Sequence, residues 1–149
     1  MIKKYLHRLL FPLLVAGSPL SAQEIDENRE PIFVSAAERA ALLEEMRGFL
    51  ETVQGTVDAL AADDMAAIAD LNTAAGMRAT AETPAALTAK LPESFRQLGV
   101  STHRLFDGIA QEATDMGDTA EITVQIGGLL ANCTACHASY RFEIENAGN

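Results

Sequence analysis

Apolar residues recur at steps of three and four along most of the chain, which is typical of helices with one buried side. Stretches in which apolar and polar residues alternate stay shorter than five residues. β-branched and aromatic residues are sparse while alanine is abundant, so strands are not expected. The pattern therefore predicts an all-α fold.

The first predicted helix runs from Ser35 to about Ala62. It begins Ser-Ala-Ala-Glu, in which the Ser35 hydroxyl can accept a hydrogen bond from the Glu38 amide while the glutamate reaches back to the serine amide. Its expected buried seam consists of Leu43, Met46, Leu50, Val53, Val57 and Leu60. Alternating steps of three and four predict packing nearly parallel to the neighbouring helices.

Three further long helices and one short helix are expected. They cover Asp64 to between Gly76 and Thr80, Thr83 to Lys90 (the short one), Ser101 to Met116 with Gly117 closing it, and Asp118 to about Phe142. Four amphipathic helices with short connections predict an antiparallel four-helix bundle, in which cofactor sites are formed by inward-facing side chains.

The apolar seam of the last predicted helix leads into the segment Cys133-Thr134-Ala135-Cys136-His137. That seam consists of Ile122, Ile126, Leu129, Cys133, Cys136, His137 and Tyr140. Cys-x-x-Cys-His is the attachment signature of c-type haem, in which each thiol adds across one vinyl group and the imidazole ligates iron. On a helix, spacings of three and four place all three side chains on one face. The segment predicts one covalent haem c, with Cys133, Cys136 and His137 binding it.

Three other interpretations of the two cysteines compete with haem attachment. A thioredoxin-like redox pair belongs beside a βαβ pattern, which this sequence lacks. A structural zinc ion needs four protein ligands, and only three candidates cluster here. A plain disulfide stays open, but it gives no reason for the histidine that follows Cys136.

The N-terminus has the composition of an export signal. Basic residues are followed by a short apolar run that is too short to span a bilayer, and then by small residues up to Ala22. We expect residues 1–22 to be a cleaved signal peptide, with a retained anchor as the alternative. Residues 23–34 are expected to be a flexible lead-in and residues 35–149 a cytochrome domain, exported to the periplasm and soluble after cleavage.

The net charge of the chain is -10, and loss of residues 1–22 would leave 8 basic and 21 acidic residues, a net charge of -13. Binding to nucleic acid requires a basic face, so it is not expected. A redox partner protein would instead present a basic docking patch.

The C-terminal motif, Cys133 to His137 followed by Ala-Ser-Tyr140-Arg141, resembles that of the cytochrome c prime family. The haem motif of that family ends in Cys-x-x-Cys-His-x-x-Phe/Tyr-Arg/Lys and stands at the end of a four-helix chain. The resemblance implies that His137 is the proximal iron ligand, that Tyr140 packs near the haem, and that Arg141 lies near a propionate. For the last two, a core tyrosine and a solvated arginine remain equally open. A homodimer is also implied by the resemblance alone.

The resembled family divides by what lies on the other side of the iron. Low-spin members supply a methionine from the first helix and transfer electrons, whereas high-spin members leave that position open and bind nitric oxide or carbon monoxide. Met46 stands at the methionine position, although Leu42 replaces the family's arginine four residues earlier. The prediction is an electron carrier that is not an enzyme, with Met46 as sixth ligand. His103 as that ligand and a gas-binding protein are the alternatives.

Overall fold

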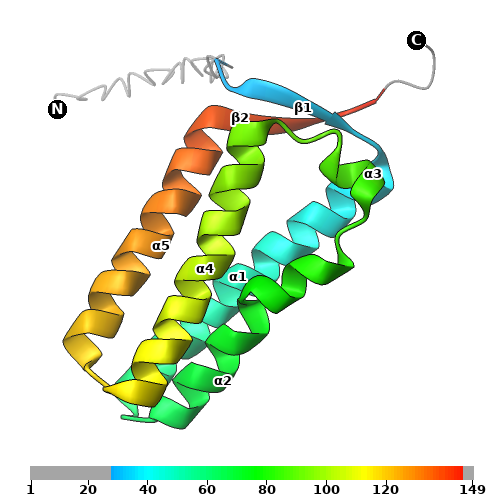
Figure 1. Cartoon of the computed structure of the whole chain (residues 1–149). Helices are drawn as coiled ribbons and strands as arrows, with labels where there is room; N and C mark the ends of the chain where they lie inside the picture. The colour runs from blue at the N-terminus through cyan, green and yellow to red at the C-terminus, as the bar shows by residue number, and fades with distance from the viewer. Residues whose placement is uncertain (1–27, 146–149) are drawn as a thin grey trace, which may run out of the picture.

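The computed structural model describes residues 28–145, and the chain is mostly helical (Figure 1). Its long helices are α1 (Ala36–Ala61), α2 (Met65–Ala75), α4 (Glu93–Asp115) and α5 (Thr119–Ser139). The 3-10 helix η1 (Met77–Glu82) and the short helix α3 (Ala85–Thr88) connect α2 to α4, and two strands, β1 (Glu30–Val34) and β2 (Tyr140–Ile144), flank the helices in sequence. The predicted helical class is confirmed.

The helix starts follow the capping residues of the sequence. At α1, Ser35 Oγ accepts from the Glu38 amide at 3.2 Å and the Ser35 amide donates to Glu38 Oε2 at 2.7 Å. Asp64 and Asp118 cap α2 and α5 with their carboxylates. Gly117 has a φ of 64°, a left-handed conformation that suits glycine, and it ends α4 as predicted.

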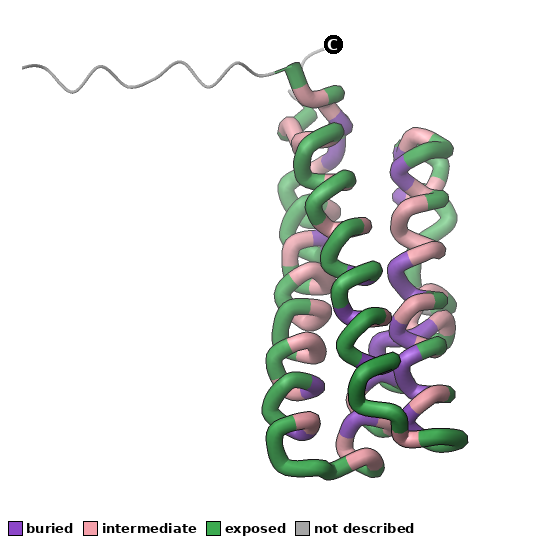
Figure 2. Tube along the Cα trace, turned by 90° about the vertical axis from the view of Figure 1, so that its left-hand side faces the viewer, coloured by how far each residue is buried: buried purple, intermediate pink, exposed green. Residues whose placement is uncertain are grey.

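The closely packed helix pairs of residues 28–145 are α1 with α2, α2 with α4, and α4 with α5. The buried residues of these helices lie on the sides that face one another (Figure 2). The main core is formed by large apolar residues of α2, α4 and α5, including Ile68, Phe106, Ile109, Ile122 and Leu129, all at most 1% exposed. The fourth side of the array, between α1 and α5, is not closely packed.

The buried side of α1 differs from the predicted seam. Leu50 and Val57 are 66% and 50% exposed, whereas Leu42, Thr56 and Ala59 are buried. Small residues face α2 here: Thr56 accepts a hydrogen bond from the buried Asn72 side chain at 2.8 Å. Because α2 approaches closely, the side of α1 that carries small residues is the buried one. A ranking by hydrophobicity alone would place that side at the surface.

The expected flexible lead-in over residues 23–34 is wrong in its last five residues, which form β1. It pairs in parallel with β2, Glu30 opposite Tyr140 and Val34 opposite Ile144. Ile32 and Val34 alternate inward and are at most 2% exposed. Their burial against Leu42, Leu87, Leu91 and Phe95 gives a second small core. The strand pair itself lies across one end of the helices (Figure 1). Residues 23–27 and the predicted signal peptide lie outside the described residues.

Two predicted helix ends are also wrong. Helix α4 begins at Glu93 rather than Ser101, because Pro92 suits a helix start and Phe95 adds a buried position. Helix α5 ends at Ser139, since Tyr140 becomes extended and enters β2. Tyr140 and Arg141 therefore lie on a strand, beyond the helical seam.

An ion-pair cluster ties the strand pair to the helices. Lys90 Nζ lies 2.8 Å from Glu38 Oε2 and 3.1 Å from Glu145 Oε1. The hydrogen bond from Lys90, together with those of Ser35, lowers the pKa of Glu38 from its ordinary 4.5 to about 2. The cluster joins the start of α1, the segment that follows α3 and the residue after β2.

This cluster predicts a loss of stability in acid. Because the pKa of Glu38 is lower in the folded chain, its contribution is complete above pH 4.5 and is lost as the pH falls towards 2. Lys90→Met should flatten that fall in the free energy of unfolding, measured by urea titration at several pH values. Arg47→Met, which removes an exposed ion pair within α1, is the control. Equal acid sensitivity in wild type and Lys90→Met would contradict the assignment.

Candidate functional site

The last turns of α5 carry Cys133, Cys136 and His137. Both cysteines are half-buried and no disulfide joins them, while His137 is exposed. The position of His137 differs from the inward position predicted for it. One helix face nevertheless holds the two thiols and the imidazole at spacings of three and four.

The electrostatic state of the thiols differs from that of a redox-active pair. Burial raises the pKa of Cys133, and burial followed by the neighbouring Cys133 raises that of Cys136. Redox-active Cys-x-x-Cys pairs depend on a lowered thiol pKa, which makes the thiolate nucleophile available. The environment of α5 favours two neutral thiols and disfavours the thioredoxin-like interpretation.

Two neighbouring cavities lie at this end of the helices. The larger, of about 300 Å³, is lined by Arg29, Arg39, Leu43, Met46, Phe95, Cys136, His137, Tyr140, Arg141 and Phe142. The smaller, of about 90 Å³, is lined by residues of α1, α4 and α5 that include Phe49, His103, Cys133 and Asn132. Met46, Phe95, Cys136 and His137 line both. All six predicted site residues therefore line one or both cavities.

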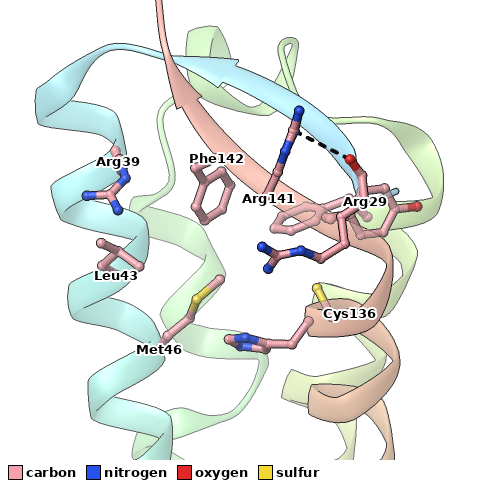
Figure 3. Close-up of a pocket in the computed structure, with 10 residues that line it drawn as sticks. Arg29, Arg39, Leu43, Met46, Cys136, Arg141 and Phe142 are labelled. Carbon is pink, nitrogen blue, oxygen red and sulfur yellow. Dashed lines mark hydrogen bonds between the residues drawn. The ribbon is translucent and has the colours of Figure 1, made fainter. Parts of the chain in front are cut away.

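Met46 lies on the side of α1 that faces α5, where the two helices are not closely packed. Its half-buried side chain projects from α1 into the larger cavity, as does that of Cys136 from α5 (Figure 3). Both sulfur-containing side chains pack against the small core that includes Leu42 and Phe95. A neutral thioether is tolerated in such surroundings and is polarizable enough to ligate a metal.

His103 is buried in α4 and is held from two sides. Its Nδ1 donates to the Ala75 carbonyl at 2.8 Å, and its ring meets that of Phe49 edge-on at a centroid distance of 5.1 Å. Its Nε2 lies 3.7 Å from Glu45 Oε1. Because a carbonyl can only accept, Nδ1 carries a proton and Nε2 faces the carboxylate. His103 lines the smaller cavity but not the larger.

Tyr140 and Arg141 both have protein partners. The Tyr140 hydroxyl shares a hydrogen bond with Ser94 Oγ, and its ring packs edge-on against Phe95 at 5.4 Å. Arg141 Nη2 lies 2.7 Å from Glu143 Oε1, and its Nη1 donates to the Arg29 carbonyl at 3.5 Å. These contacts fix the wall that β2 gives to the larger cavity.

Sequence reasoning missed two basic residues of the site, Arg29 and Arg39. Arg39 lies four residues before Leu43 and seven before Met46, so helical spacing could have placed all three on one face. Arg29 immediately precedes β1 and reaches the cavity only through the strand pair. No local sequence signal marks it.

Comparison of the chain with known protein families, curated proteins and solved structures finds no match. Within residues 28–145, no group of three or more histidine, cysteine or acidic side chains could hold a metal ion. No helix of the same region combines the length and apolar character needed to cross a bilayer.

Proposed function

We propose that the chain is an exported mono-haem c-type cytochrome that transfers electrons and is not an enzyme. Its helices would form an antiparallel four-helix bundle, with the haem between α1 and α5. One observation carries the proposal: the Cys-x-x-Cys-His face of α5 and Met46 of α1 line the same two cavities. When bound, the haem would supply a one-electron ferric/ferrous couple.

The residues of the site fit such a group. Two unpaired, half-buried thiols at the cavity edge suit thioether formation, in which each S–H adds across a vinyl C=C bond. The His137 imidazole would ligate the iron on one side and the Met46 thioether on the other. The combined cavities, about 300 and 90 Å³, fall within the range of ligand pockets, about 300–1,000 Å³.

The proposal extends to location and partners. The N-terminal residues have an export composition, so the mature protein would act in the periplasm with a net charge of -13. A redox partner would then dock through a basic patch. A homodimer through α1 is included, because Leu50 and Val57 give that helix exposed apolar surface.

A second function, binding of a small gas such as nitric oxide or carbon monoxide, is favoured by the smaller cavity. It adjoins Met46 and is bordered by Phe49 and His103. A diatomic molecule could enter such a space if the thioether were displaced or did not ligate the iron. The accessibility and polarity of the pocket next to the iron decide between gas binding and electron transfer.

Optical spectra of the purified full-length product separate these functions. For the oxidised and reduced protein with and without carbon monoxide, we expect a low-spin haem that stays unchanged on exposure to the gas. The ferric form should show the weak far-red absorption of methionine ligation. A high-spin spectrum that changes with carbon monoxide would select gas binding, and absence of haem would refute both.

A further inference from the structure

The larger cavity is basic in an acidic protein. Of the ten residues within 28–145 that line it, three are arginines and none is aspartate or glutamate. The whole chain has 21 acidic residues against 11 lysines and arginines. Arginines that line one cavity together stabilise an anion in it, because charges in a cleft with apolar walls are poorly screened.

The three arginines are not equivalent. Arg141, which the family resemblance assigns to a propionate, already forms an ion pair with Glu143 at 2.7 Å. Within residues 28–145, the Arg39 guanidinium makes no hydrogen bond or ion pair, and its sequence neighbour Glu38 is bound to Lys90 at 2.8 Å. Arg39 therefore keeps its charge available to an incoming anion.

The position of Arg39 relates it to the proposed iron ligand. Arg39, Leu43 and Met46 project from one side of α1 into the cavity, and Arg29 reaches into it from the other side (Figure 3). Seven residues of helix separate Arg39 from Met46 by about 10 Å along the axis. A haem likewise carries its two carboxylates at the ring edge, away from the iron.

We propose that Arg39 binds a propionate carboxylate of the haem, and that Arg141 does not. The inference rests on the proposed haem function. A guanidinium can give two parallel N–H donors to one carboxylate, which fixes orientation as well as charge. Arg39 is thus a positioning residue, and its charge favours the ferrous over the ferric state.

The test measures the reduction potential of the matured, full-length protein and of charge variants. A unit charge bound at the edge of the haem is felt appreciably at the iron in partly buried surroundings. Arg39→Gln should shift the ferrous-to-ferric ratio at fixed potential about three- to tenfold towards ferric, where tenfold equals about 59 mV for one electron. Arg39→Lys, which keeps the charge, should restore most of the shift.

Two controls make the result specific. Arg47→Gln removes an arginine of α1 that pairs with Glu44 and lines neither cavity, so its potential should match the wild type. Arg141→Gln should shift the potential less than Arg39→Gln does. If Arg39→Gln moves it no more than Arg47→Gln, or if Arg141→Gln has the largest effect, the inference is wrong while the haem function stands. A wild type without covalent haem overturns both.

Discussion

Replacing both Cys133 and Cys136 by alanine should reduce haem staining on a denaturing gel to background. Denaturation strips a haem held only by iron ligands and packing, so staining that survives it reports thioether bonds. Neither thiol is engaged in a disulfide, and both line the cavities into which the proposed haem would fit. Each single variant should keep weaker staining through its remaining bond.

A substitution at one of the two residues between the cysteines gives the matched control. Thr134 is exposed and its hydroxyl bonds only within α5, to the Leu130 carbonyl at 3.0 Å. Thr134→Ala should therefore stain as strongly as the wild type at equal protein load. Staining that persists in the double cysteine variant would show that the Cys-x-x-Cys-His interpretation is wrong.

Met46→Ala should convert a low-spin haem protein into a high-spin one that takes up carbon monoxide readily. The substitution removes the thioether from the wall that both cavities share. A gas molecule in the smaller cavity could then reach the proposed iron. The optical spectrum with and without the gas measures the change. We expect carbon monoxide binding to go from undetectable to stoichiometric.

Two further variants identify the ligand. Met116→Ala removes a methionine that is 79% exposed and should change nothing. His103→Ala should leave the spectrum nearly unchanged, because Nδ1 is held by Ala75 and Nε2 faces Glu45. If His103→Ala alone opens the iron, the sixth ligand is imidazole. If the wild type already binds the gas, Met46 is no ligand.

The features that sequence predicts well here are local. The capping box of Ser35, the carboxylate caps of Asp64 and Asp118, and the positive φ of Gly117 each depend on residues within one helical turn. The grouping of two thiols and an imidazole on one helix face is equally local. Such patterns act through the backbone nearby, so they are readable without knowledge of the tertiary structure.

The features that sequence missed depend on distant partners. Strand β1 has only Ile32 and Val34 as an alternating signal, and it exists because β2 lies beside it. Likewise, the buried side of α1 is chosen by the close approach of α2 to Thr56. Arg29 enters the cavity wall for the same reason, since its place follows from the strand pair rather than from its neighbours in sequence.

The pairing of β1 with β2 also predicts an order of events during folding. Glu30 and Tyr140 are 110 residues apart in the chain, and closing a loop of that length costs on the order of 4 kcal/mol in chain entropy. The helix pairs joined by short turns close far smaller loops, so we expect them to form earlier. Because β2 and Arg29 provide one wall of the larger cavity, we expect that wall to be completed last, with the thiols of α5 facing an open site until the two ends of the fold meet.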